Sequence, residues 1–178
     1  MIRELSVRPV PTNKNAKAFF LGSLFLALVS LVVYFSVDKY RGIVGLFIIV
    51  FLTAGILVYT KYISAQYYYD VTFDSNGAPV FVVRQVTGKR QTTLCRVDLY
   101  AIRSVTLLEG ENKKQHKAPD KAVRYVYTPT LFPSSVYLIY VKSSYEHAEL
   151  MIECSEEFAS LLMSYADEAR AQRVDDEE

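Results

Sequence analysis

The sequence is poor in the residues that most often build catalytic and metal centres. It has only two cysteines and two histidines in 178 residues, and they show no spacing typical of metal ligands. It also has no glycine-rich phosphate loop and no nucleophile elbow. His116 and His147 lie in a charged segment and beside a predicted turn, which favours solvated histidines over catalytic ones. We therefore expect a protein that is not an enzyme and uses no cofactor or metal.

Charge is missing from two long stretches near the N-terminus. Residues 18–37 and 42–60 contain no Asp, Glu, Lys, Arg or His, and only residues 38–41 separate them. Runs of 20 and 19 residues match the roughly 20 that a helix needs to cross a bilayer. The pattern predicts a two-helix transmembrane hairpin, and its first run is too long and starts too late for a cleaved signal peptide. The lack of an intramembrane ionisable group weighs against a pump or transporter.

The distribution of Lys and Arg predicts an orientation for this hairpin. Four cations precede the first span and Lys61 follows the second, whereas only Lys39 and Arg41 lie in the turn. Five against two favours cytoplasmic N- and C-termini in the cell membrane. Residues 1–61 carry a net charge of +5 and residues 62–178 a net charge of −4, and this acidic remainder argues against a nucleic-acid partner. In a reducing cytoplasm, Cys95 and Cys154 are expected to be buried thiols; in an oxidising compartment they could form a disulfide.

Small residues recur in both predicted spans and allow helices to approach closely. Gly22 of the first span and Ala54 of the second lie at similar depth in a hairpin. We expect them in the contact between the two helices. The alternative is that the same faces mediate homo-oligomerisation.

From Tyr67 on, apolar residues alternate with period two, which is typical of strands with one buried face. The pattern predicts seven strands, at residues 67–73, 79–86, 91–97, 100–108, 122–128, 135–141 and 147–153. Asp74-Ser75-Asn76-Gly77 contains the Asn-Gly pair of a tight hairpin turn. Residues 1–17 are expected to form an extended lead-in and residues 109–121 a loop. In the last strand, Glu149 and Leu150 are expected on opposite faces.

After residue 154 the period becomes helical. Ser155 is a good N-cap, and acidic residues follow it in the first turn. Apolar residues then recur at i, i+3, i+4 and i+7. We expect an amphipathic helix over residues 155–173 and an acidic tail over residues 174–178.

Seven antiparallel strands closed by one C-terminal helix resemble a pleckstrin-homology-like (PH-like) domain. Two closely linked spans before such a domain resemble the bacterial membrane proteins that carry a PH-like domain behind a transmembrane pair. The segment Val97-Asp98-Leu99-Tyr100-Ala101-Ile102-Arg103-Ser104-Val105 is similar to the family's pattern of a polar turn leading into an Ile-x-x-Val strand. The resemblance implies a seven-stranded, mainly-β barrel over residues 67–173 with the helix plugging its open end. It does not imply phosphoinositide binding, because the lipid-binding members have basic residues around the first hairpin, whereas residues 74–77 are acidic and polar.

The hairpin and the resemblance together predict a membrane-anchored, non-enzymatic interaction or scaffold domain. It would assemble or regulate protein partners at the cytoplasmic face, with Leu131 and Phe132 as candidate partner contacts if they are exposed rather than core. One alternative is sensing of anionic lipid through basic loops, with candidate contacts at Lys89, Arg90, Lys113, Lys114 and Lys117. A second alternative is a small subunit of an oligomeric channel or transporter. The bilayer is the one partner that the sequence identifies.

Overall fold

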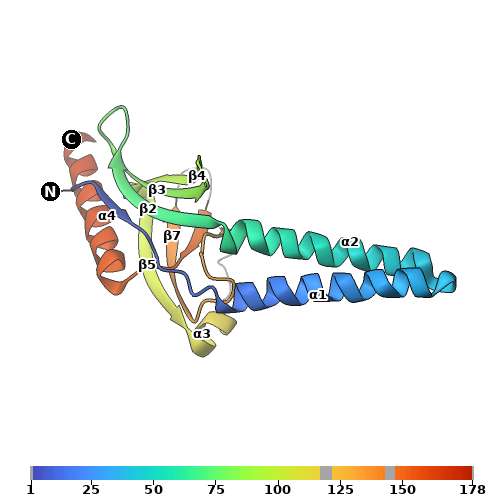
Figure 1. The fold of residues 1–178 in the computed structure, drawn as a ribbon. Coiled ribbons are helices and arrows are strands. Elements are labelled where there is room, and N and C mark those ends of the chain that lie inside the picture. Colours follow the sequence, from blue (N-terminus) through green and yellow to red (C-terminus); the bar gives the residue numbers. More distant parts are fainter. Residues whose placement is uncertain (1, 117–121, 143–146, 178) are drawn as a thin grey trace. The chain divides into compact units, whose positions relative to one another are not determined.

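A computed structural model describes residues 2–116, 122–142 and 147–177 of the chain, with the backbone alone at residues 111, 114, 115 and 174–177 (Figure 1). The chain divides into two compact units. The first, here the hairpin unit, comprises Pro11–Ala65 and Thr130–Phe132. The second, here the sheet unit, combines Met1–Val10, Gln66–Pro129 and Pro133–Glu178.

The hairpin unit contains two long helices that run antiparallel (Figure 1). Helix α1 spans Lys14–Ser36, a short 3₁₀ turn η1 spans Asp38–Tyr40, and helix α2 spans Arg41–Val58. A π turn, η2, continues α2 over Tyr59–Ile63. Both helices are long and apolar enough to cross a membrane, so the prediction of two such helices is confirmed. At about 1.5 Å per residue, the 23 residues of α1 extend about 35 Å.

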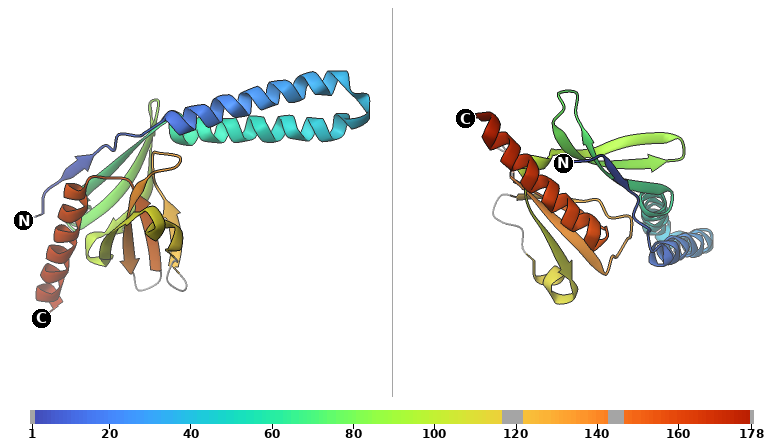
Figure 2. Two further views of the ribbon diagram at one scale, coloured as in Figure 1. Left: turned by 90° about the horizontal axis from the view of Figure 1, so that it is seen from below. Right: turned by 90° about the vertical axis from the view of Figure 1, so that its left-hand side faces the viewer.

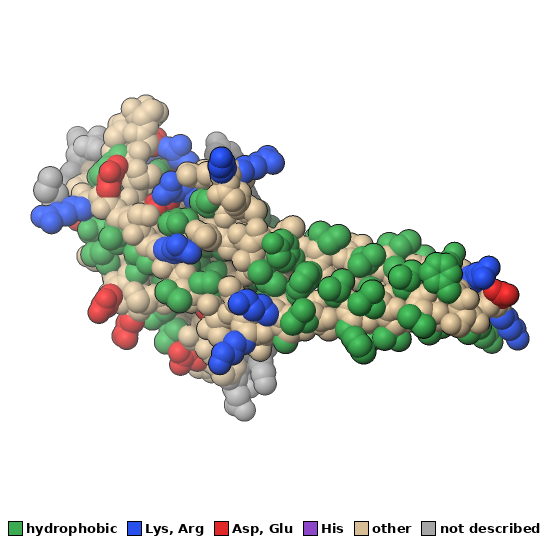
Figure 3. All heavy atoms as spheres, in the orientation of Figure 1, with side chains coloured by type: hydrophobic (Ala, Val, Ile, Leu, Met, Phe, Trp, Pro, Cys, Tyr) green, Lys and Arg blue, Asp and Glu red, His purple; other side chains and the backbone are tan. Residues whose placement is uncertain are grey.

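The outer surface of the hairpin is apolar along its length. Large hydrophobic side chains such as Phe25, Leu28 and Ile49 are exposed on it, and charged side chains gather at its η1 end (Figure 3). Two helices that are uncharged over residues 18–36 and 42–58 and expose hydrophobic side chains on their outside are favoured by a hydrocarbon environment and disfavoured by water.

The two helices meet through small residues, but Gly22, one of the two that the sequence suggested, is not at their contact. Ser23, Ala27 and Gly55 are buried, with Gly55 against Ser23, whereas a Cβ on Gly22 would meet no atom within 4 Å. Hydrophobicity alone cannot distinguish Gly22 from Ser23, because both are small and adjacent. The rotation of each helix about its axis decides which of them faces the partner helix.

The described residues of the sheet unit form eight strands in two four-stranded sheets and a C-terminal helix (Figure 2). Sheet A has the order β1-β2-β3-β4 and sheet B the order β5-β7-β8-β6. The prediction of one seven-stranded barrel is therefore wrong in strand number and in closure. The strands are β1 Leu5–Val7, β2 Ala65–Phe73, β3 Pro79–Thr87, β4 Arg90–Asp98, β5 Ile102–Glu109, β6 Ala122–Val126, β7 Ser135–Lys142 and β8 His147–Ile152.

The additional strand, β1, lies in the segment that was expected to be an extended lead-in. It pairs antiparallel with β2, with Leu5 opposite Val71 and Val7 opposite Tyr69. Three residues are too few for a periodic pattern to be visible in a sequence. The strand forms because β2 offers it a free edge.

Two further features of sheet B depart from the sequence prediction. Strand β6 pairs parallel with β8, in register from Ala122 opposite His147 to Val126 opposite Met151. The predicted loop before β6 begins with a short helix, α3, at Gly110–Gln115. Alternating hydrophobicity shows which face of a strand is buried but not the direction in which its neighbour runs.

The first hairpin turn has the predicted chemistry. The Asp74 carboxylate accepts hydrogen bonds from the backbone N–H groups of Asn76 at 2.7 Å and Ala78 at 2.9 Å. Gly77 has a φ of 78°, a left-handed conformation that glycine adopts without steric cost.

Helix α4, at Glu156–Glu177, packs against β5 and the 3₁₀ turn η3 at Leu99–Ala101. The Ser155 hydroxyl accepts a hydrogen bond from the N–H of Phe158 at 3.3 Å, which confirms the predicted N-cap. The Phe158 ring lies 6.4 Å from that of Tyr69 and 6.5 Å from that of Phe81, both on the buried face of sheet A. One helix therefore contacts both sheets. It continues through most of the segment predicted to be an acidic tail.

Tyr69 also joins the two sheets through its hydroxyl group. The ring is fully buried, and the hydroxyl donates to the Tyr127 carbonyl at 2.7 Å and accepts from the Glu153 N–H at 3.3 Å. These two backbone groups follow β6 and β8, so a side chain of sheet A binds the ends of two strands in sheet B. Burial raises the pKa of Tyr69 far above its ordinary value, which keeps this hydroxyl protonated.

Candidate functional site

A cleft of about 400 Å³ lies between the two sheets of the sheet unit. Strand β4 contributes one wall, and β6, β7 and β8 contribute the other. The lining mixes apolar and aromatic side chains, with Leu94, Cys95 and Val97 on one side and Tyr125, Tyr127 and Leu150 on the other. The charged residues Arg96 and Asp98 of β4 line it as well. A concave apolar site with a few polar groups is the usual form of a ligand or peptide site.

The two strands that flank this cleft are the outermost strands of their sheets. In the described part of the chain, β4 ends sheet A and β6 ends sheet B. A strand edge presents backbone N–H and C=O groups that an additional strand can pair with. The cleft therefore combines a partly apolar lining with two strand edges.

A β-bulge shapes the β4 side of the cleft. Val83 is opposite Cys95 but Arg84 is opposite Thr93, so Leu94 has no counterpart in β3. The Tyr127 hydroxyl donates to the Leu94 carbonyl across a distance of 3.5 Å. Bulges redirect side chains and interrupt strand pairing at sheet edges, and this one lies in the wall of the cleft.

The cleft holds neutral polar groups from Tyr125, Tyr127 and Cys95, beside the charged residues Arg96 and Asp98 of β4, which also line it. Tyr125 and Tyr127 stack with ring centroids 6.2 Å apart and planes 3° apart. Burial raises the pKa values of both Tyr127 and Cys95. A hydrogen bond with Tyr127 lowers the pKa of Cys95 and so offsets part of that rise. At neutral pH the site therefore offers hydroxyl and thiol groups in their protonated forms.

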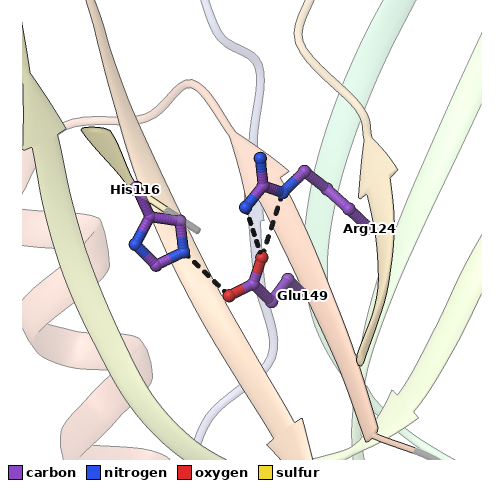
Figure 4. Close-up of polar contacts among 3 residues, drawn as sticks. All are labelled: His116, Arg124 and Glu149. Atoms are coloured by element: carbon purple, nitrogen blue, oxygen red, sulfur yellow. Dashed lines mark hydrogen bonds and ion pairs between the residues drawn. The ribbon is translucent and has the colours of Figure 1, made fainter. Parts of the chain in front are cut away.

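A second arrangement, on sheet B, joins three ionisable side chains (Figure 4). Glu149 on β8 is only 1% exposed. One of its oxygens, Oε1, lies 2.8 Å from Nε2 of His116, and the other, Oε2, accepts from Nε of Arg124 at 3.0 Å and lies 2.9 Å from an Nη atom of the same guanidinium. Strand register explains the Arg124 contact, because Arg124 and Glu149 are opposite each other in the parallel β6–β8 pair.

In this His116–Glu149–Arg124 cluster, both oxygens of the buried Glu149 carboxylate have hydrogen-bond partners. A buried carboxylate without partners would cost several kcal/mol, and charge-assisted hydrogen bonds from a guanidinium offset that cost. The cluster ties the chain after α3 to β6 and β8. Its geometry thus supports a role in holding sheet B together.

The sequence assignment of His116 to solvent is wrong, since its side chain is 24% exposed and contacts Glu149. The ion pair between Glu149 and Arg124 could not be predicted from the periodicity of the sequence, because the two residues lie on strands that are not consecutive. The one visible clue was an acidic residue between Ala148 and Leu150 in a predicted strand. Only the parallel pairing of β6 with β8 places Arg124 opposite it.

A third polar group occupies the other face of β2. Asp70, buried to 5% exposure, forms an ion pair with Arg84 of β3, and this contact raises the pKa of the Arg84 guanidinium. The Tyr68 ring lies 6.0 Å from the guanidinium carbons of both Arg84 and Arg8. Two sheets of one domain thus each carry a buried carboxylate paired with an arginine.

The residues predicted for lipid contact are not gathered into one described site. Lys89 and Arg90 are exposed at the turn between β3 and β4. Lys113 belongs to α3, where its amine donates to the Pro133 carbonyl at 2.5 Å. The side chain of Lys114 and the whole of Lys117 lie outside the described residues.

The residues predicted for partner contact, Leu131 and Phe132, lie in the segment Thr130–Phe132 of the hairpin unit. Phe132 is 66% exposed and Leu131 is half-buried. The sequence left open whether this pair was a surface patch or core, and for Phe132 the structure shows a surface position.

Cys95 and Cys154 are free thiols, each half-buried. Burial raises the pKa of Cys154 to about 12. Cys95 lines the cleft between the sheets, whereas Cys154 lies in a different hollow beside Val7 and Pro9. The two thiols therefore label two separate parts of the sheet unit.

Comparison of the chain with protein-family models, curated proteins and solved structures gave no match. The predicted order of elements is present at a coarse level: two apolar helices, then a β-sheet domain, then a C-terminal helix.

Proposed function

We propose that this chain is a membrane-anchored, non-enzymatic interaction module whose cleft between the sheets binds an extended segment of a protein partner. The hairpin holds the sheet unit at the cytoplasmic face of the membrane. The observation that carries the proposal is that a partly apolar cleft is bordered by β4 and β6, the outermost strands of their sheets in the described part of the chain.

The hairpin supports the anchoring part of this proposal. Its helices have the length and composition of membrane spans, and their outward side chains are hydrophobic (Figure 3). The end at which the chain enters and leaves carries Lys14, Lys17 and Lys61, and the turn carries Lys39 and Arg41. Together with Arg3 and Arg8, this excess favours the open end of the hairpin on the cytoplasmic side.

The cleft supports the binding part of the proposal. An extended peptide that adds to β4 or β6 gains main-chain hydrogen bonds, and its alternate side chains enter the space lined by Leu94, Tyr125 and Leu150. A tyrosine side chain supplies a large contact area and loses little conformational entropy on binding, and tyrosine is enriched at protein interfaces. A partner of this chemistry would be a strand-forming segment with apolar side chains at every second position.

Site-specific photo-crosslinking of the full chain in cell membranes tests the proposal. A photoreactive residue at Tyr125 lies in the cleft, and one at Thr106, an exposed position on β5, serves as the matched control. We expect the chain to stay in the membrane during alkaline extraction, and to form a discrete adduct with another protein from position 125 and none from position 106. Release of the chain by alkali contradicts the membrane anchor. Equal adducts at both positions, or none at position 125, contradict binding of a partner in the cleft.

A further inference from the structure

We propose that the Thr130–Phe132 segment is a third membrane contact, which places the Phe132 ring in the lipid headgroup region beside the open end of the hairpin. This inference rests on the proposed function, because it requires that the hairpin crosses a bilayer. It adds a lipid-binding loop that the two helices alone do not provide.

The position of the segment within the hairpin unit carries the inference. The backbone N–H of Thr12 donates to the Thr130 hydroxyl at 3.2 Å. Thr12 precedes the first residue of α1, Lys14, by two positions. Thr130 is 3% exposed whereas Phe132 is 66% exposed. The segment is therefore anchored through the buried Thr130 beside the start of α1, and its tip, Phe132, is exposed.

The length of α1 sets the depth at which this contact lies. Its 23 residues extend about 35 Å, against about 30 Å for the hydrocarbon core of a bilayer. The residues just before Lys14 therefore lie at the level of the headgroups when the helix spans the membrane. The hydrogen bond to Thr12 holds Thr130 at that same level.

The neighbouring side chains have the chemistry of a membrane interface. Lys14, Lys17 and Lys61 are exposed at this end of the hairpin, and the only acidic residue of the hairpin unit, Asp38, is at the opposite end. Tyr59 is exposed here as well, with its ring 5.5 Å from that of Phe20. Cations that attract anionic headgroups, together with aromatic rings, are typical of the ends of membrane spans.

The backbone around the segment limits the freedom of its tip. Pro129 and Pro133 flank it in the sequence, and proline restricts the backbone of the unbound loop. In the sheet unit, the Pro133 carbonyl accepts a hydrogen bond from Lys113. An exposed phenylalanine on a restrained loop loses little entropy when lipid covers it.

Depth-dependent fluorescence quenching of the full chain in liposomes tests this inference. The chain has no tryptophan, so Phe132→Trp introduces a single one at an exposed position. Phe25→Trp, at the middle of α1, is the matched control for insertion of the hairpin. Liposomes of mixed neutral and anionic lipid carry bromine either close to the headgroup or at the end of the acyl chain, and iodide is the aqueous quencher.

We expect the Phe25→Trp chain to be quenched most by deep bromine and the Phe132→Trp chain most by shallow bromine, with little quenching of either by iodide. If the Phe25→Trp chain behaves so but the Phe132→Trp chain is quenched only by iodide, the loop contact is wrong and the anchor stands. If the Phe132→Trp chain is shielded from both bromine and iodide, a protein surface covers the loop and the inference is overturned. If the Phe25→Trp chain escapes quenching by bromine, both the anchor and the loop contact fail. Leu131→Trp repeats the measurement should Phe132→Trp disturb the loop.

Discussion

The hydroxyl oxygen of Ser23 lies 2.7 Å from the point that a Cβ atom on Gly55 would occupy. The same hydroxyl donates to the Phe20 carbonyl at 2.8 Å, so it is held in place on α1 and faces α2. This contact lies in the buried seam of the hairpin unit. Close approach of two helices at this point requires that residue 55 has no side chain.

Gly55→Ala is expected to destabilise the helix pair by about 1–3 kcal/mol, because the new methyl group overpacks the seam. Ser23→Ala in the same chain removes the clash, since its Cβ stays 3.8 Å away. The double variant should therefore recover most of the loss. Denaturation by SDS in mixed micelles measures the effect, with Tyr59→Trp as the sole tryptophan beside Phe20.

Gly22→Ala is the control for this seam, because a Cβ there meets no atom within 4 Å. It should leave the midpoint of the SDS titration unchanged. If Gly55→Ala destabilises the helix pair equally in the Ser23 and the Ser23→Ala backgrounds, residues 23 and 55 are not in contact.

Tyr69→Phe is expected to lower the free energy of unfolding by about 1–3 kcal/mol, because the Tyr127 carbonyl and the Glu153 N–H lose their buried partner. Phenylalanine retains the ring contact with Phe158. Urea denaturation of the full chain in detergent measures the loss. Hydrogen exchange should rise first at the segments that contain residues 127 and 153.

Tyr68→Phe is the matched control for Tyr69. It removes a hydroxyl that donates to the exposed Gln66 side chain at 3.4 Å, so its effect should stay within about 0.5 kcal/mol. Similar losses for the two variants would mean that the bridge between the sheets is not formed.

Arg124→Ala is expected to lower the free energy of unfolding by about 3 kcal/mol, because it leaves the buried Glu149 carboxylate with His116 as its remaining partner. Glu149→Gln should cost less, since it removes the charge itself. In a double-mutant cycle the two changes should be non-additive by more than about 1 kcal/mol. Additive losses would contradict the parallel register that places these residues opposite each other.

Alkylation of Cys154 in the folded chain is expected to be slow at neutral pH. Burial raises the pKa of this thiol from 9.0 to about 12, so at pH 8 it has roughly a thousandfold less thiolate than an exposed cysteine. Its rate with iodoacetamide should still be rising at pH 10. The folded state should also lose stability as the pH rises from about 9 toward 12, because the unfolded thiol ionises first.

Cys95 is the internal comparison for Cys154. Burial raises the pKa of its thiol too, but the hydrogen bond with Tyr127 lowers it in part, so Cys95 should react first. Both should react alike in denaturant. A Cys154 rate that levels off below pH 9 would show that this thiol is not buried.

The long apolar helices could be predicted because their signal is local and strong. Uncharged runs of 20 and 19 residues have few alternatives to a helix, whatever surrounds them. The Asp74–Gly77 turn and the Ser155 cap could also be predicted, because each is formed by a side chain that accepts a hydrogen bond from a backbone N–H a few residues away. Most strands followed from the alternation of apolar residues.

The features that no local pattern encodes are those that depend on neighbours far along the chain. Strand β1 exists because β2 has a free edge, and β6 runs parallel to β8 because of the path that the chain takes between them. Glu149, His116 and Arg124 meet only after that pairing has formed. The same holds for Ser23 against Gly55, where a rotation of one helix by a single residue would exchange Ser23 for Gly22. Residue type sets what a side chain can do, whereas strand order, register and helix rotation set what it touches.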